Sequence, residues 1–246
     1  MQNIINFLVL KFDDLTLDEA VTKTERFIKG NKPHMIFTTG AELMVRAHWD
    51  ETLKEIYLNS DLLTIDSSGV CFAAYLLGKP VRESISGTRL MFRFLELKVT
   101  MGYRFYFLGS TEKILRKAIE NLKDRHPSLN VVGWHHGYFD FKNDSSVVAK
   151  IVKAKPDVLF VAMSTPLKEK FISKNLEKMN VPVSIGVGGG VDVAAGQCKL
   201  APRWMSKILL EWFYRLVQEP NRLWKRYAVT NTVFIWLVMK EFFKRF

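Results

Sequence analysis

Short, nearly continuous apolar runs recur along most of the chain. A run without polar alternation is typical of a strand that is buried on both faces, as in a parallel sheet. The stretches between the runs read as helices, so strands and helices alternate. Strands are predicted at Phe7–Val9, Met35–Phe37, Leu62–Ile65, Arg104–Leu108, Asn130–Trp134, Asp157–Ala162 and Val183–Val187. The pattern therefore predicts an α/β fold with a mostly parallel, Rossmann-like sheet and helices on both of its faces.

Several of the predicted helices have recognisable starts. Thr16 and Asp50 can each cap a following helix with a side-chain oxygen, and Gly87 opens a further one. The loop after Leu62–Ile65 leads into another apolar run, Val70–Leu77. The remaining helices are predicted to begin at Ala41, to cover Thr111–Arg125 and Ser145–Ala154, and to follow Pro166.

Small and polar residues directly follow the predicted strands. In a parallel sheet, ligands bind beyond the carboxyl ends of the strands, so these residues should gather at one rim. They are Thr38, Thr39, Asp66, Gly109, Ser110, Ser164, Thr165, Gly188, Gly189 and Gly190. Glycines in such a place let backbone N–H groups approach a ligand closely, as a diphosphate requires. A plain turn after the strand is the competing interpretation.

The last fifth of the chain is basic and aromatic. Between Trp204 and Leu216 apolar residues fall four apart, which predicts a helix with a broad apolar stripe, and Pro220 ends or kinks it. The formal net charge is +11, and Lys199–Phe246 holds ten Lys and Arg against three Asp and Glu. Basic residues interleaved with Trp, Phe and Tyr favour a surface that meets anionic headgroups or diphosphates. Nucleic acid is the competing anion, but no nucleic-acid motif is present.

Two parts are therefore expected: an α/β core over residues 1–198 and a helical appendage over residues 199–246. The apolar run Val233–Met239 is far shorter than the roughly 20 residues that span a bilayer, and the N-terminus lacks a signal-peptide layout. We expect a cytoplasmic, peripheral protein whose appendage lies in the membrane interface. Packing of the appendage on the core, or on a second subunit of a homo-oligomer, is the alternative.

A metal site has little support in the sequence. The chain has two cysteines and five histidines, and His135 and His136 are adjacent, which is the wrong spacing for two ligands on one helix face. The sequence also has no Asp-x-Asp triplet that could supply paired carboxylate ligands. The two cysteines, Cys71 and Cys198, suit a reducing compartment.

Three motifs near the end of the chain carry a family resemblance. GVGGGVDVAAG, Ala201-Pro202 and LEWFYRLVQEPNR together resemble the WecG/TagA/CpsF glycosyltransferases (glycosyltransferase family 26), and HHGYF at His135–Phe139 fits the same family. The similarity extends from about Lys11 to Arg226. It implies inverting transfer of an N-acetylmannosamine-type or related sugar from a UDP-sugar to an undecaprenyl-diphosphate-linked sugar. The resemblance also implies action at the inner face of the membrane, without a metal or other cofactor.

Asp66 is the expected catalytic base, because the resemblance places the family's proposed base after this strand. A sugar hydroxyl is a poor nucleophile until a base takes its proton. On the residues alone, an aspartate that caps the next helix is the alternative. Thr38 and Thr39 offer hydroxyls to the substrate sugar, or to local backbone groups. Lys168 could stabilise the leaving diphosphate as a point charge, or be a solvated surface residue.

The resemblance also implies a binding site for the UDP donor. Asp192 could accept hydrogen bonds from the ribose or the base, Tyr138 could pack on the uracil ring, and arginines could bind the diphosphate. Each of these residues taken alone could equally be structural. The expected donor-site residues are Gly109, Ser110, Tyr138, Gly188, Gly189, Gly190, Asp192, Arg215, Arg222 and Arg226.

Four positions depart from the family pattern near the expected rim. Gly40 stands where relatives have Asn, Ser67 where Gly is usual, Ser84 where they have Arg, and Lys168 where they have Gln. The departures indicate altered substrate choice, or weakened or lost activity. The competing hypothesis is therefore a non-catalytic relative that binds UDP-sugar or the lipid carrier.

Overall fold

The computed structural model describes residues 4–30, 32–199, 201, 205, 211–218 and 220–244. The chain folds as two compact units. Unit 1 comprises Met1–Thr16, Thr38–Ser86 and Leu200–Phe246, and unit 2 comprises Leu17–Phe37 and Gly87–Lys199.

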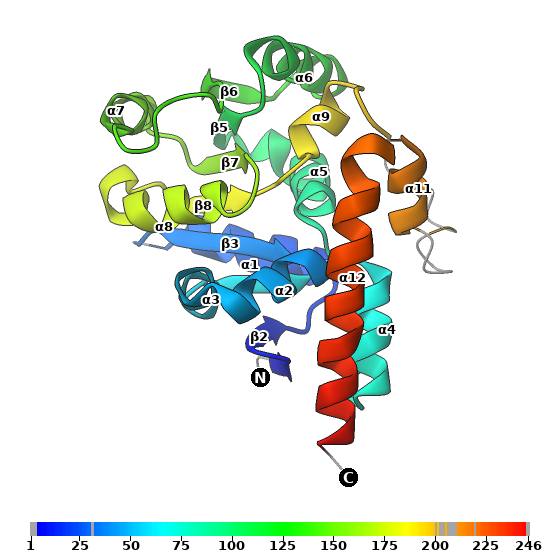
Figure 1. The fold of residues 1–246 in the computed structure, drawn as a ribbon. Helices are drawn as coiled ribbons and strands as arrows, with labels where there is room; N and C mark the ends of the chain where they lie inside the picture. The colour runs from blue at the N-terminus through cyan, green and yellow to red at the C-terminus, as the bar shows by residue number, and fades with distance from the viewer. Residues whose placement is uncertain are drawn as a thin grey trace. The chain divides into compact units, whose positions relative to one another are not determined.

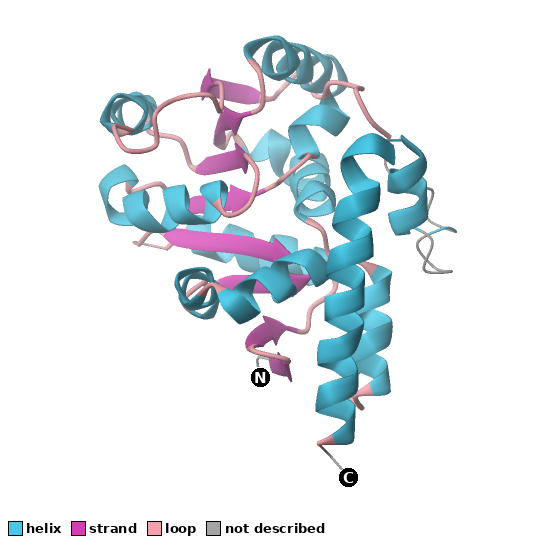
Figure 2. Cartoon of the chain, in the orientation of Figure 1, coloured by secondary structure: helices cyan, strands magenta, loops and turns pink. Residues whose placement is uncertain are grey.

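A six-stranded parallel sheet runs through the fold in the order β4-β3-β8-β7-β5-β6 (Figures 1 and 2). Its strands are β3 (His34–Thr39), β4 (Leu62–Ile65), β5 (Arg104–Gly109), β6 (Asn130–His135), β7 (Val158–Ala162) and β8 (Val183–Gly186). Every residue of β3, β4, β7 and β8 is buried. The parallel α/β prediction is therefore confirmed. It could be made from the sequence because strands buried on both faces appear there as unbroken apolar runs.

Unit 2 has helices on both faces of its strands. One group comprises α1 (Leu17–Ile28), α5 (Gly87–Lys98), α6 (Glu112–Arg125) and the short α9 (Gly190–Ala194), while α7 (Ser145–Ala154) and α8 (Leu167–Met179) form the other. Figure 1 shows α7 and α8 on the opposite side of β7 from α5 and α6. A short 3-10 helix, Val99–Met101, leads from α5 to β5.

The aromatic core of unit 2 lies between neighbouring strands. Phe105 and Phe160 stack with their ring centroids 5.9 Å apart, and Phe107 lies 5.3 Å from Phe160. All three side chains are buried. Large aromatic side chains contribute much of the apolar area that such a core removes from water, so these rings hold β5 and β7 together.

Unit 1 begins with a hairpin of β1 (Ile4–Phe7) and β2 (Leu10–Asp13). The predicted strand Phe7–Val9 is therefore wrong in its bounds, because Leu8 and Val9 form the turn. Leu8 has a φ of 52°, the left-handed conformation that two-residue hairpin turns require. Leucine rarely adopts that conformation, so the residue types give no sign of the turn.

The other described helices of unit 1 are α2 (Ala41–Trp49), α3 (Glu51–Leu58), α4 (Ser68–Leu76), α11 (Glu211–Gln218) and α12 (Pro220–Phe243). Helices α2 and α3 begin where the sequence predicts, whereas the run Val70–Leu77, which was given no secondary structure, forms most of α4. Much of the helix predicted between Trp204 and Leu216 lies outside the described residues, which show it from Glu211 onward. Asp50 caps α3 as predicted, with its carboxylate accepting a 3.0 Å hydrogen bond from the N–H of Leu53. The predicted break at Pro220 is confirmed, because α12 begins there.

Helix α12 packs on α2 within unit 1. Phe234 is buried and its ring lies 6.3 Å from that of Phe7, in an edge-to-face contact. Leu237 and Val238 are also buried. One face of this helix therefore packs on its own unit. Packing of the appendage on the core was the alternative to a position in the membrane interface. None of the described helices is long and apolar enough to cross a bilayer.

Candidate active site

Asp66 follows β4 directly, as the sequence predicts. Its backbone N–H donates a 2.8 Å hydrogen bond to the carbonyl of Thr39, the last residue of β3, and this bond fixes the start of the loop. The Asp66 side chain is partly exposed. Ser67, not Asp66, occupies the N-cap position of α4. The carboxylate thus lies at the end of a buried strand, where it can meet a substrate hydroxyl.

Two of the departures from the family pattern contact each other beside Asp66. The hydroxyl of Ser84 accepts a 3.0 Å hydrogen bond from the N–H of Ser67. Ser67 has a φ of 86°, a backbone conformation that glycine adopts far more readily than serine. The position where relatives have Gly therefore keeps a glycine-like shape here, at a cost in strain.

We predict that Ser67→Gly raises the free energy of unfolding by about 1 kcal/mol, because glycine adopts a positive φ without strain. The backbone N–H that Ser84 accepts from is kept in this variant. Urea unfolding followed by tryptophan fluorescence measures the change. Ser68→Gly, one residue later inside α4, is the matched control and should destabilise. A loss of stability in Ser67→Gly would contradict the strain assignment.

Cys71 is a neighbour of Asp66 that the sequence analysis did not place in the site. Burial, together with the negative charge of Asp66, raises the pKa of the Cys71 thiol to about 12, against a smaller opposing effect of its hydrogen bond with Ser84. The thiol therefore stays protonated at neutral pH. Cys71 lies four residues after Ser67, and residues four apart on a helix are neighbours. This spacing was the sequence signal that could have placed Cys71 near Asp66.

The two threonines of the predicted site lie within β3 rather than after it. Thr39 is completely buried, and no described residue forms a hydrogen bond with its hydroxyl. Thr38 retains slight exposure. Both threonines are therefore buried, and Thr38 is the less completely buried of the two. Gly40 follows them, and a Cβ there would lie 3.4 Å from the carbonyl oxygen of Asp66.

In unit 2, the predicted donor-site residues Ser110 and Asp192 meet directly. The Ser110 hydroxyl donates a 3.0 Å hydrogen bond to Oδ1 of Asp192. Gly109 precedes it with a φ of 129°, and a Cβ at this position would lie 2.1 Å from the carbonyl oxygen of Ala162. Only glycine fits there, so the sharp end of β5 depends on it.

The HHGYF loop lies against the same turn. The Gly137 N–H donates a 2.9 Å hydrogen bond to the carbonyl of Ser110, and a Cβ at Gly137 would lie 3.0 Å from the Cα of Gly109. The next residue, Tyr138, is 74% exposed, so its ring is accessible to a ligand. Gly137 was missed as a site residue, although its place within HHGYF was an available signal.

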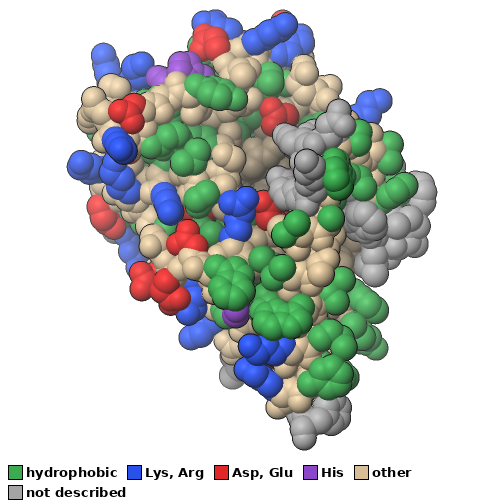
Figure 3. Space-filling view, viewed as in Figure 1, with side chains coloured by type: hydrophobic (Ala, Val, Ile, Leu, Met, Phe, Trp, Pro, Cys, Tyr) green, Lys and Arg blue, Asp and Glu red, His purple; other side chains and the backbone are tan. Residues whose placement is uncertain are grey.

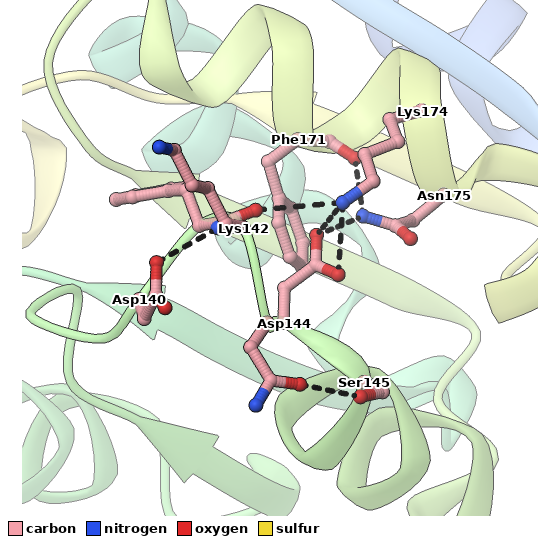
Figure 4. Close-up of polar contacts among 9 residues, drawn as sticks. Asp140, Lys142, Asp144, Ser145, Phe171, Lys174 and Asn175 are labelled. Atoms are coloured by element: carbon pink, nitrogen blue, oxygen red, sulfur yellow. Dashed lines mark hydrogen bonds and ion pairs between the residues drawn. The ribbon is translucent and has the colours of Figure 1, made fainter.

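Asp144 anchors the chain that follows this loop (Figure 4). Its buried carboxylate accepts hydrogen bonds from Nζ of Lys174, at 3.0 and 3.1 Å, and from Nδ2 of Asn175, at 2.8 Å. Burial would raise the pKa of Asp144, but the hydrogen bonds from Asn175 and Lys174 outweigh it and hold the pKa below its usual value. Helix α8 thereby holds the segment that leads from the HHGYF loop into α7.

The glycine cluster after β8 divides into two roles. Gly188 has a φ of 51° and open space around it, while a Cβ at Gly189 would lie 3.9 Å from Oδ2 of Asp192. A Cβ at Gly190 would instead meet Met91 at 3.2 Å, so this residue packs against α5. Gly189 therefore lies beside Asp192, Gly188 borders open space, and Gly190 serves packing.

Lys168 is not a solvated surface residue. Its side chain is buried on α8, with Nζ 2.6 Å from Oε1 of Glu169 and hydrogen-bonded to the hydroxyl of Thr165. That hydroxyl in turn donates a 3.0 Å hydrogen bond to Glu169. The lysine stem lies across Gly186, where a Cβ would be 3.2 Å from Cε. The positive charge is thus neutralised by a buried carboxylate, which the sequence analysis did not foresee.

The three predicted diphosphate-binding arginines belong to helices of unit 1. Arg215 lies in α11, and Arg222 and Arg226 lie in α12. Their side chains are outside the part of the chain that the structure describes, so their role stays a prediction. The gathering of Asp66 and the Gly188–Gly190 cluster at one rim also stays a prediction.

Residues 5–246 match the protein family described as "Glycosyl transferase WecG/TagA/CpsF family". A relative from Bacillus spizizenii, named N-acetylglucosaminyldiphosphoundecaprenol N-acetyl-beta-D-mannosaminyltransferase, is 31% identical over 218 residues, which cover 88% of this chain and 84% of the relative. A protein of the same name from Staphylococcus aureus is 28% identical over 235 residues, covering 95% of this chain and 90% of that protein.

Proposed function

Because the chain belongs to the WecG/TagA/CpsF family of glycosyltransferases, we propose that it transfers a sugar from a UDP-sugar to a sugar carried on undecaprenyl diphosphate. The name of the relatives gives an N-acetyl-β-D-mannosaminyl group as the one transferred and N-acetylglucosaminyldiphosphoundecaprenol as the acceptor. We propose the same acceptor here, and an N-acetylmannosamine-type or related hexose as the donor sugar. The product would enter the synthesis of teichoic acid or another cell-surface polysaccharide.

The observation that carries the proposal is the partly exposed Asp66 carboxylate at the end of β4. In the proposed reaction, this carboxylate takes the proton from the acceptor hydroxyl as its oxygen attacks the anomeric carbon. The bond from that carbon to the diphosphate breaks, and UDP leaves with the electron pair. A single displacement of this kind inverts the anomeric centre.

The donor would bind beside the turns after β5 and β8. Asp192 would accept hydrogen bonds from the nucleoside, with Ser110 orienting its carboxylate and Tyr138 packing on the uracil ring. Backbone N–H groups near Gly188 and Gly189, together with Arg215, Arg222 and Arg226, would stabilise the leaving diphosphate in place of a metal. The charge of Lys168 is already paired with Glu169, so Lys168 would not bind the diphosphate directly. It would instead position Thr165 and Glu169.

A donor screen tests the proposal. The protein is incubated with a panel of UDP-sugars and N-acetylglucosaminyl-diphosphoundecaprenol in the presence of EDTA, and the lipid products are read by mass spectrometry. We expect one donor to extend the acceptor by a single sugar. Absence of product with every donor would contradict the transferase function. Product that forms only after a divalent metal is added would contradict the metal-independent mechanism alone.

Binding without turnover is the second candidate function, and the Ser84 contact favours it. The Ser84 hydroxyl is bonded to the backbone of Ser67, so this position offers no cation where relatives have Arg. Lys168 does not replace that charge, since Glu169 neutralises it. Calorimetry that detects UDP binding, alongside a donor screen without product, would support this candidate.

A further inference from the structure

Helix α4 presents an exposed apolar face. Phe72, Tyr75 and Leu76 are 48%, 65% and 49% exposed, and their i, i+3, i+4 spacing places them on one side of the helix. The helix Ser68–Leu76 contains no charged residue. A contiguous set of large apolar side chains left in water usually marks a surface that meets a partner or a lipid.

The C-terminal half of α12 adds a second exposed apolar face within the same unit. Ile235, Trp236 and Phe243 are 60%, 51% and 65% exposed, whereas Phe234 and Leu237, on either side of Ile235 and Trp236, are buried. Figure 3 shows hydrophobic side chains gathered over this helix and over α4. The exposed residues are therefore a distinct face of α12, separate from the one that packs on α2.

An ion pair joins these two helices. Lys79, in the turn directly after α4, lies 2.7 Å from Glu241 near the end of α12, and both side chains are partly buried. Figure 1 shows α4 and α12 lying alongside each other. The two helices are therefore neighbours, and we call their exposed apolar residues together the α4–α12 edge: Phe72, Tyr75, Leu76, Ile235, Trp236 and Phe243.

The chemistry of the α4–α12 edge fits a lipid surface better than a protein. Tyr75 and Trp236 are the amphipathic aromatics that concentrate at the headgroup level of bilayers. Nζ of Lys240 lies 5.0 Å from the Trp236 ring, and Lys244 is exposed one turn later. Exposed lysines beside apolar residues attract anionic headgroups, whereas lysine is depleted in protein–protein interfaces.

We infer that α4 is a second membrane-contacting helix, which enters the lipid interface together with α12 and holds the Asp66 loop close to the headgroups. Helix α4 begins two residues after Asp66, and its nine residues span about 13 Å. An apolar tip in the interface would therefore keep the carboxylate within one short helix length of the plane where a lipid-linked diphosphate lies. The catalytic part of this inference rests on the proposed transferase function.

Vesicle binding tests the inference without relying on activity. Full-length protein is mixed with vesicles of three parts phosphatidylcholine to one part phosphatidylglycerol and floated on a density gradient. The triple variant Phe72→Ser, Tyr75→Ser, Leu76→Ser should bind at least about tenfold more weakly than the wild type, because it loses most of the apolar area of α4. Circular dichroism and thermal melting check that the variants fold.

A matched control removes the same number of exposed apolar side chains from unit 2. The variant Leu97→Ser, Met101→Ser, Val152→Ser should bind vesicles as the wild type does. Wild-type binding by the α4 variant would overturn the inference. A second result would also overturn it: a wild type that is a dimer and does not bind vesicles, together with an α4 variant that is a monomer. The α4–α12 edge would then be a contact between two copies of the chain.

Kinetics separate this inference from the proposed function. The rate of transfer is measured with a vesicle-embedded acceptor and with a water-soluble, short-chain acceptor. The ratio of the first rate to the second should fall about tenfold in the α4 variant, because the KM for the embedded acceptor rises. An unchanged ratio would overturn the link between α4 and the acceptor. If the wild type transfers to neither acceptor, the proposed function fails, while the flotation result still decides whether α4 meets lipid.

Discussion

Asp66→Asn is expected to lower kcat for sugar transfer by about 10²- to 10⁴-fold, the usual contribution of a general base. The asparagine amide has nearly the shape of the carboxylate but cannot take a proton from the acceptor hydroxyl. The backbone N–H of residue 66 would still donate to the Thr39 carbonyl, so the loop after β4 should keep its shape. The loss should therefore lie in the chemical step rather than in folding.

The measurement is kcat and KM for the donor identified by the screen, together with the melting temperature. Asp50→Asn provides a matched control in the same unit, because asparagine caps a helix about as well as aspartate does. This control should leave kcat unchanged. An unaltered kcat in Asp66→Asn would remove the base assignment and would favour the second candidate function.

Lys168→Met is expected to lower the free energy of unfolding by about 3–5 kcal/mol, as is typical when one partner of a buried ion pair is removed. The side chain of Glu169 is 0% exposed, so its carboxylate would be left in the interior without its counter-charge. Methionine keeps most of the apolar stem that lies across Gly186. The destabilisation would therefore report the lost charge rather than a cavity.

Urea unfolding at neutral pH measures this effect. The double variant Lys168→Met, Glu169→Gln should recover most of the lost stability, because no buried charge remains. Lys117→Met is the control for an exposed pair. Lys117 forms an ion pair with Glu120, and the two side chains are 53% and 61% exposed. Loss of this pair should lower the free energy of unfolding by less than about 1 kcal/mol. Equal effects of Lys168→Met and Lys117→Met would contradict the buried-pair assignment.

The sequence predicted the parallel sheet well because its physical cause is visible in the chain. Strands covered on both faces need unbroken apolar runs, and the predicted bounds Leu62–Ile65 match β4 residue for residue. Position 66 could thus be placed at a strand end without a structure. The β1–β2 turn could not be predicted, because Leu8 adopts a positive φ that its residue type disfavours.

The contacts around the candidate site were much harder to predict. Ser67 and Ser84 read as two independent departures from the family, yet they share one hydrogen bond across 17 positions of the chain. Lys168 and Glu169 are adjacent in the sequence, and adjacent residues on a helix normally point in different directions. Their pairing depends on the way the first turn of α8 packs beside Thr165 and Gly186, which no local pattern encodes.

The crowded backbone at Gly109 limits how the sugar preference of this enzyme could be re-engineered. Any side chain at Gly109 would collide with Ala162, and one at Gly137 would press on Gly109 itself, so libraries randomised at these positions would yield mostly misfolded chains. A Cβ at Gly189 would have its nearest neighbour at 3.9 Å, on the carboxylate of Asp192. Within the proposed donor site, room for larger side chains is therefore concentrated beside Asp192, and directed evolution would do best to begin there.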